Sequence, residues 1–295
     1  MNNVTLKQLR YFDALARHGH FGRAAEASSI SQPALSMQIK ELETALGTNL
    51  FERGARGVQL TSFGAKVQSH VEGILRAIDE LGDLARADGA GLTGPLKLGV
   101  IPTIAPYILP RVIREITRTF QDIDLQVRET LTPNLLLELH EGRLDAAILA
   151  LPVSEPWLTE TALFDEAFVL VRPKKDAKKP VPDTEGLKTM RLLLLEEGHC
   201  FRDQALSFCN MSAVPRDGLD GSSLTTLVQM VGSGLGVTLI PEMAVPVETR
   251  SAPVAVQRFT TTQPKRQIGM VWRKTSPLAR NLSEVSDVVR RAAGP

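Results

Sequence analysis

A long helical pattern that ends abruptly divides this chain of 295 residues into two dissimilar parts. The pattern starts after Thr61, a candidate N-cap, and its apolar residues recur at spacings of four and three: Val67, Val71, Ile74, Ile78, Leu81 and Ala85. A seam of nearly three heptads predicts a linker helix that pairs with a second copy of the chain. Residues 88–95, DGAGLTGP, then break the helix and predict a domain boundary.

Three shorter helical patterns precede the linker. Residues 6–15 carry apolar side chains at helical spacing, and residues 21–27 contain small side chains that permit close helix packing. The third pattern has Ser31 as N-cap and Pro33 in its first turn, and it ends at Gly47. Its apolar stripe consists of Leu35, Ile39, Leu42 and Leu46. Two helices joined by a tight turn are therefore expected at 21–46.

The polar face of the third helix suits a nucleic acid. Amide, hydroxyl and ammonium groups of this kind bind base edges and phosphates in a major groove, and the candidate contacts are Gln32, Pro33, Ser36, Gln38 and Lys40. Residues 50–52 and 58–60 read as a hairpin with Arg53 and Arg56 at its tip, which predicts a phosphate clamp. The alternative is an amphipathic surface helix whose polar face is merely solvated.

Beyond residue 95 short apolar runs alternate with helical patterns. The helical stretches include 107–119 and 134–141, and strands are expected at 96–100, 125–129, 146–151, 168–171, 192–195, 237–240 and 268–271. Such alternation predicts an α/β domain with mainly parallel sheets, and about 200 residues suffice for two lobes. Thr103 and Thr132 lie just past the first two strands, where ligands bind in such sheets.

Composition restricts the class of protein without deciding it. The chain is 43% hydrophobic and has a net charge of +1, so two ordinary cores are expected. It offers no apolar stretch of membrane-spanning length and no leader-like N-terminus, so we expect a cytoplasmic protein without membrane contact. Residues 1–66 hold eight Lys and Arg against five acidic residues, which is too mildly basic to indicate DNA binding by charge alone.

The two cysteines, Cys200 and Cys209, lie in one short segment. In a reducing cytosol two thiols are often plain buried side chains. If the intervening residues are helical, nine residues separate the Cα atoms by roughly 13 Å and put the side chains on opposite faces. A disulfide requires Cα atoms about 4.4 to 6.8 Å apart, so the bond would require local unfolding.

The N-terminal half resembles a known family. Ala24-Ala25, residues 31–36 (SQPALS), Leu42-Glu43 and residues 50–53 (LFER) are similar to the DNA-binding domain of LysR-type transcription regulators. Residues 142–146 (GRLDA) and 232–237 (GSGLGV) are similar to the effector domain of that family. The resemblance implies a winged helix-turn-helix joined by a long linker helix to a two-lobed, periplasmic-binding-protein-like α/β domain. The expected domains are 1–61, 62–93 and 94–295.

A narrower motif, residues 197–205 (EGHCFRDQA) with Cys209, resembles the peroxide-sensing OxyR branch, as do residues 99–103 and 163–166. This resemblance implies that Cys200 is the peroxidatic thiol and Cys209 the resolving one. It also places Thr103, Thr132, His199 and Arg266 around the peroxide. The implied partners are promoter DNA, hydrogen peroxide and RNA polymerase, and the implied assembly is a homotetramer built on the linker-helix homodimer.

The chemistry requires a thiolate, because an ordinary cysteine is only a few per cent ionised near neutral pH. Cys200 is expected at the start of a helix over 201–208, where the helix dipole favours an anion. His199, Arg202 and Arg266 would add positive charge or hydrogen bonds, and the Thr103 and Thr132 hydroxyls would orient peroxide. In the alternative interpretation Thr103 caps a helix and His199 satisfies a backbone carbonyl.

Peroxide would convert Cys200 to a sulfenic acid, and Cys209 would then condense with it as the segment rearranges. Through the linker helices this change is expected to alter the spacing of the DNA-binding domains. Two alternatives are a LysR-type regulator that binds a small organic effector in the interlobe cleft, and a thiol peroxidase or dithiol oxidoreductase. A purely structural DNA-bending protein is rejected, because it would have no use for an α/β domain of about 200 residues. We expect no enzyme, no cofactor and no metal site, because the five histidines are scattered and no Cys-x-x-Cys occurs.

Overall fold

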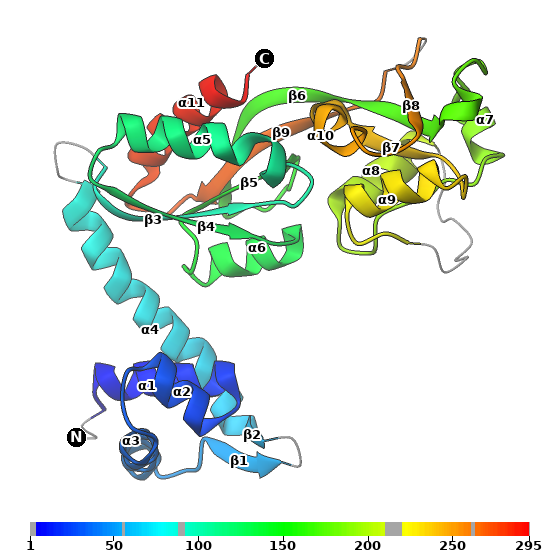
Figure 1. Ribbon diagram of the computed structural model, residues 1–295. Coiled ribbons are helices and arrows are strands. Elements are labelled where there is room, and N and C mark those ends of the chain that lie inside the picture. Colours follow the sequence, from blue (N-terminus) through cyan, green and yellow to red (C-terminus); the bar gives the residue numbers. More distant parts are fainter. Residues whose placement is uncertain (1–3, 55–56, 88–91, 210–219, 261–262, 295) are drawn as a thin grey trace. The chain divides into compact units, whose positions relative to one another are not determined.

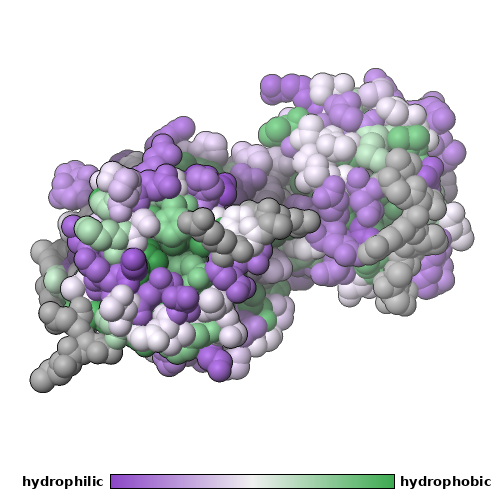
Figure 2. Space-filling model, turned by 90° about the horizontal axis from the view of Figure 1, so that it is seen from below, coloured by the Kyte–Doolittle hydropathy of each residue, from purple (hydrophilic) through white to green (hydrophobic). Residues whose placement is uncertain are grey.

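The computed structural model describes residues 4–54, 57–87, 92–209, 220–260 and 263–294. The chain forms two compact units, Met1–Ala85 and Arg86–Pro295, and each is described by itself. In the part of the chain that is described, no helix is long and apolar enough to cross a membrane. Most of the surface visible in Figure 2 is hydrophilic, with hydrophobic residues in patches between the polar ones.

The first unit is a three-helix core followed by a two-stranded hairpin (Figure 1). Its elements are α1 (Leu6–His18), α2 (Phe21–Ala27), α3 (Gln32–Leu46), β1 (Phe51–Gly54), β2 (Gly57–Leu60) and the start of α4 (Ser62–Ala87). Thr5 caps α1 in a capping box with Gln8, and Ser31 caps α3 as predicted. The predicted helices, hairpin and long linker helix are confirmed.

Apolar residues from all three helices and the hairpin meet in one core. Phe12, Leu15, Leu35 and Leu42 are fully buried there, and the ring of Phe12 lies 5.3 Å from that of Phe51 on β1. The stripe predicted for α3 therefore faces inward, with Leu46 partly buried at its end. This packing leaves the polar face of α3 to the solvent.

The second unit is built on one seven-stranded sheet in the order β4-β3-β5-β9-β6-β7, with β8 also paired to β6. The strands are β3 (Gly94–Val100), β4 (Ile123–Glu129), β5 (Ala146–Leu151), β6 (Leu158–Pro173), β7 (Thr238–Pro241), β8 (Val254–Gln257) and β9 (Lys265–Arg273). The helices are α5 (Ala105–Thr119), α6 (Thr132–His140), α7 (Thr184–Lys188), α8 (Cys200–Phe208), α9 (Leu224–Gly232), α10 (Val245–Glu248) and α11 (Ala279–Ala293). Short 3-10 turns occupy Lys174–Asp176 and Glu242–Ala244.

The expectation of mainly parallel sheets is wrong. Among the strands of the described residues, β3 pairs parallel with β4 and with β5, while the four pairings of β6 and β9 are antiparallel. The cause is β6, a strand of 16 residues whose first half carries alternating polar residues and was not expected from the sequence. Strand β8 was missed as well. The strand expected at 192–195 forms only isolated bridges, from Leu192 to Val237 and from Leu195 to Gly221.

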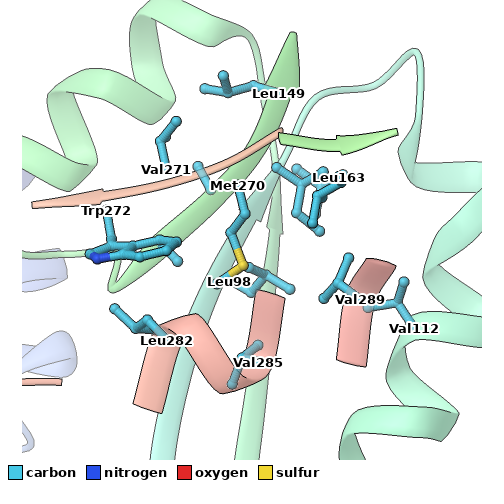
Figure 3. Packing of buried hydrophobic residues seen from close by; sticks show 14 of the residues in the cluster. Leu98, Val112, Leu149, Leu163, Met270, Val271, Trp272, Leu282, Val285 and Val289 are labelled. Carbon is cyan, nitrogen blue, oxygen red and sulfur yellow. The ribbon is translucent and has the colours of Figure 1, made fainter. Parts of the chain in front are cut away.

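Two hydrophobic cores define two lobes of this unit. In the first lobe, Met270 and Trp272 of β9 pack with Leu98 of β3 and with Leu282 and Val285 of α11 (Figure 3). Helices α5 and α11 cover one face of its sheet, and α6 lies on the other (Figure 1). The second core gathers β6 residues 168–171 with α8, α9 and β7. Because β6 contributes to both cores, it connects the lobes, as a two-lobed regulatory fold requires.

Candidate functional site

The predicted DNA-contacting face lies on α3. Gln32, Pro33, Ser36 and Lys40 are exposed there, and Gln38 is half-buried and donates a hydrogen bond to Glu41 Oε2 at 2.8 Å. Arg56 lies outside the described residues, as does the side chain of Arg53. This face of α3 thus presents an amide, a hydroxyl and an ammonium group to the solvent.

Glu43, which belongs to the motif that carries the family resemblance, makes a contact with the hairpin that was not predicted. Glu43 Oε1 accepts hydrogen bonds from the backbone N–H groups of Leu50 at 2.7 Å and Phe51 at 3.2 Å. A hollow of about 870 Å³ lies between α3 and the hairpin, with Ser36 and Lys40 on one wall and Phe51 and Val58 on the other. Glu43 therefore holds the β1–β2 hairpin in place relative to α3.

The two cysteines occupy opposite ends of α8, and both are free thiols. Cys200 is the first residue of the helix, is half-buried, and packs against the core of the first lobe. Cys209 is the C-cap, is 0% exposed, and belongs to the core of the second lobe. Burial raises the pKa of the Cys209 thiol, although Lys188 opposes this. The helix expected between the two cysteines is confirmed.

His199 precedes Cys200 as the N-cap of α8. Within the described residues its side chain accepts no hydrogen bond from the first turn. Burial lowers the pKa of His199, and only Glu196 acts in the opposite direction. A neutral imidazole at pH 7 is a donor and acceptor of hydrogen bonds rather than a cation.

Thr103 and Arg266 lie in direct contact in a buried polar cluster. Arg266 Nη1 donates to Thr103 Oγ1 at 2.9 Å, and Nη2 donates to the Thr103 carbonyl oxygen at 3.2 Å. The same guanidinium binds Glu166 Oε2 at 2.7 to 2.8 Å, with side-chain exposures of 1% and 4% for Arg266 and Glu166. Burial raises the pKa of Glu166, whereas Arg266 lowers it.

Arg266 also connects this cluster to α8. Its guanidinium carbon lies 5.3 Å from the centre of the Phe201 ring and 5.9 Å from that of Phe168. A cation over an aromatic face is attracted to the ring electrons. The residue directly after Cys200 therefore contacts the arginine that was predicted to bind peroxide.

Thr132 is the first residue of α6. Among the described residues its buried Oγ1 has no hydrogen-bond partner. A buried hydroxyl without a partner is energetically costly, and Thr132 itself is not among the residues that line the neighbouring pocket. Its neighbours Thr130 and Leu131 line a pocket that also contains Thr103 and His199.

This pocket measures about 330 Å³ and lies between the lobes. Its remaining walls come from both lobes and are Pro102, Pro106, Tyr107, Glu129, Leu195, Ser222, Ser223, Leu224, Thr225 and Glu248. Tyr107 of α5 donates a hydrogen bond to Glu248 Oε1 on α10 at 2.7 Å. Burial and the Glu248 carboxylate both raise the pKa of Tyr107, so this bond persists at neutral pH. No local sequence pattern predicts this contact, which joins residues 141 positions apart.

Arg202, which was expected to add positive charge or hydrogen bonds near Cys200, forms hydrogen bonds with other groups. It is buried on α8, and its Nη1 donates to the Leu195 carbonyl oxygen at 2.6 Å and to Asp220 Oδ1 at 3.1 Å. Arg202 is therefore already paired, whereas Cys200 is the first residue of α8, where the helix dipole is positive. No cluster of three or more metal-ligating side chains occurs in the described ranges.

Comparison with family models matches both parts of the chain. Residues 6–65 match the "Bacterial regulatory helix-turn-helix protein, lysR family", and residues 89–294 match the "LysR substrate binding domain".

Curated relatives match over nearly the whole length. The chain is 43% identical over 294 residues to a "Probable hydrogen peroxide-inducible genes activator" from Streptomyces viridosporus, covering 98% of this chain and 94% of the relative. It is 38% identical over 293 residues to the "DNA-binding transcriptional dual regulator OxyR" of Escherichia coli strain K12, covering 97% and 95%.

Solved structures give the same result. A full-length OxyR variant from Pseudomonas aeruginosa matches with a TM-score of 0.75 at 38% identity, covering 98% of this chain and 95% of that one. A hydrogen peroxide-bound OxyR mutant from Corynebacterium glutamicum matches with a TM-score of 0.66 at 37% identity, covering 98% and 92%.

Proposed function

The chain belongs to the LysR family of bacterial transcription regulators, and we propose that it senses hydrogen peroxide and controls oxidative-stress genes in response. The observation that carries this proposal is the pair of free cysteines at the two ends of α8, a helix whose Phe201 contacts the arginine of a buried Thr103–Arg266 cluster. Its relatives are regulators rather than enzymes. We assign DNA binding to residues 1–61, dimerisation to 62–93 and peroxide sensing to 94–295.

The proposed reaction has two steps that balance without a cofactor. The Cys200 thiolate attacks one oxygen of the peroxide, an S–O bond forms, the O–O bond breaks, and hydroxide leaves as water once it is protonated. The Cys209 sulfur then attacks the sulfenic acid, an S–S bond forms, and the S–O bond breaks with loss of water. Two electrons pass from the thiols to the peroxide.

Four residues are proposed to hold the peroxide next to Cys200. The Thr132 hydroxyl, which lacks a partner among the described residues, would bind one oxygen, and neutral His199 would exchange a second hydrogen bond with the substrate. Arg266 would act through Thr103, whose hydroxyl it orients at 2.9 Å. A positioned hydroxyl of this kind can hand a proton to the leaving oxygen.

The proposed DNA interface consists of Gln32, Pro33, Ser36, Gln38 and Lys40 of α3, together with Arg53 and Arg56 of the hairpin. Glu43 holds the hairpin beside the helix, which supports a simultaneous contact with a major groove and the adjacent phosphates. Exposed apolar residues on α4, among them Ile74, Leu81 and Leu84, favour pairing with a second copy. A homotetramer, contact with RNA polymerase and a cytoplasmic location complete the proposal.

The test is a footprint of the protein on promoter DNA before and after stoichiometric peroxide, with Cys200→Ser as the matched control. We expect the wild-type footprint to change on oxidation and the variant footprint to stay constant. If both proteins respond equally to peroxide, Cys200 is not the sensor. If neither responds, while a small organic molecule changes the footprint, the interlobe pocket of about 330 Å³ is the effector site and the cysteines are inert.

A further inference from the structure

The start of α8 has little intrinsic stability. Its N-cap provides no side-chain hydrogen bond within the described residues, and the preceding Gly198 has a φ of +93°, a conformation that favours glycine. Cys200 itself is only half-buried. The far end is different, because Cys209 is fully enclosed in the core of the second lobe. If one end of the helix must move to join the sulfurs, the Cys200 end is the one that can.

Phe201 opposes that movement. Its side chain is 2% exposed, its ring meets that of Phe168 on β6 edge-on at 4.8 Å, and its centre lies 5.3 Å from the Arg266 guanidinium carbon. Edge-to-face aromatic pairs and buried cation–aromatic contacts both stabilise beyond the burial of apolar area. These contacts exist only while the first turn of α8 is in place.

We propose that Phe201 is a positioning residue that sets how easily the peroxide-oxidised protein reaches its disulfide. The inference rests on the proposed function of the two cysteines and adds the residue that regulates their second step. Joining the sulfurs brings Cα atoms from roughly 13 Å to about 6 Å, and Phe201 is directly bonded to the residue that moves. Its ring must therefore leave Phe168 and Arg266 before the S–S bond closes.

The arrangement has a thermodynamic consequence. Every contact of Phe201 that is made in the dithiol form and lost in the disulfide form favours the dithiol. Weakening these contacts shifts the exchange with glutathione toward the protein disulfide and lowers its reduction potential. By contrast, a mutation that removes a contact made equally in the dithiol and disulfide forms changes the stability of the protein without changing its reduction potential.

The experiment equilibrates the full-length protein in glutathione buffers of graded potential and counts alkylated thiols by intact mass. Phe201→Leu keeps an apolar side chain and removes the ring. We expect this variant to shift the exchange equilibrium toward the disulfide by about tenfold, which corresponds to a reduction potential about 30 mV lower. Phe168→Leu removes the partner ring without changing α8, so a smaller shift in the same direction is expected. This second variant keeps the test available if Phe201→Leu fails to fold.

Phe259→Leu is the matched control. The Phe259 ring meets Phe208 at the other end of α8 at 5.2 Å and 69°, nearly the geometry of the Phe168–Phe201 pair at 4.8 Å and 68°. We expect the equilibrium constant of Phe259→Leu for exchange with glutathione to stay within about twofold of the wild-type value. If Phe201→Leu and Phe168→Leu match the wild type, or if Phe259→Leu shifts as much as they do, the inference is overturned. If the wild type forms no disulfide at all, the proposed function itself fails.

Discussion

The two ends of helix α8 place chemically identical thiols in opposite surroundings. Cys200 stands at the positive end of the helix dipole and is half-buried against the core of the first lobe, and its neighbour Phe201 contacts Arg266 of the Thr103–Arg266 cluster. Cys209 stands at the other end, 0% exposed, and burial raises its pKa. The difference teaches that a single helix can give two identical thiols different exposure and different electrostatic surroundings, as the proposed division of roles between Cys200 and Cys209 requires.

The largest effect on the reaction with peroxide is expected when each cysteine is replaced by serine in turn. Cys200→Ser removes the nucleophile, so its consumption of peroxide should fall by more than about 100-fold. Cys209→Ser keeps the reactive end of the helix and should react within about twofold of the wild type, stopping at a sulfenic acid. Stopped-flow kinetics with a sulfenic-acid trap distinguish the two. Equal rates in both variants would remove the contrast between the two ends.

The Arg266–Glu166 pair supports the reactive end, and breaking it should damage the fold. Arg266→Met leaves the Glu166 carboxylate buried without its cation, which is expected to cost roughly 3 to 5 kcal/mol in the free energy of unfolding. The double variant Arg266→Met with Glu166→Gln should recover most of this loss, because no charge is then stranded. Urea titration of the reduced protein measures both. No recovery in the double variant would show that Arg266 stabilises the protein mainly through Thr103 and the aromatic rings.

A smaller, kinetic effect is expected at Thr103. Thr103→Val keeps the shape but removes the hydroxyl that accepts from Arg266, and we expect the first step to slow by about tenfold or more. Thr103→Ser, which retains the hydroxyl, is the control and should stay near the wild-type rate. The rate of loss of the Cys200 thiol at fixed peroxide reports the step. If valine and serine behave alike, the hydroxyl takes no part in it.

The Arg202–Asp220 ion pair should contribute less. Arg202 is buried, but the side chain of Asp220 is 42% exposed, so solvent weakens the pair. Asp220→Asn is expected to cost about 0.2 to 1 kcal/mol in the free energy of unfolding. Raising the salt concentration should narrow the gap between wild type and variant. A gap that is independent of salt would point to a hydrogen bond rather than charge.

The smallest effect concerns His199 and pH. Burial lowers its pKa below the ordinary 6.5, so the folded protein binds this proton less readily than the unfolded chain. The stability of the wild type should therefore fall slightly as pH drops through 6.5, and His199→Gln should lose that component. Between pH 7 and 8 both proteins hold a neutral side chain, so their rate profiles with peroxide should run parallel. If the wild type alone reacted faster with peroxide near pH 7 than near pH 8, the His199 side chain would be a protonated imidazolium there, which contradicts the expectation.

Local sequence patterns were sufficient for the helices and the hairpin of the first unit. Ser31, Pro33 and Gly47 mark the ends of α3 by backbone chemistry that acts within a few residues. The placement of Cys200 at a helix start was predictable for the same reason. The roles of Thr103 and Arg266 came from family resemblance, and the structure adds that they are in contact.

Features that depend on distant pairing were not predictable. Glu166 faces Arg266 because β6 and β9 pair antiparallel in a register that joins residues 100 positions apart. The alternation of strands and helices suggested parallel sheets instead, since the polar first half of β6 hid a strand. The Phe168–Phe201 and Tyr107–Glu248 contacts likewise arise from the packing of separate elements. No spacing within one segment encodes them.

In the proposed mechanism, peroxide oxidises Cys200 first and Cys209 second. The most direct test titrates the reduced protein anaerobically with hydrogen peroxide and counts free thiols with intact mass in the wild type, Cys200→Ser and Cys209→Ser. We expect stoichiometric peroxide to remove both wild-type thiols as a Cys200–Cys209 disulfide and to leave a sulfenic acid at Cys200 in Cys209→Ser. Survival of both thiols in excess peroxide would contradict the account.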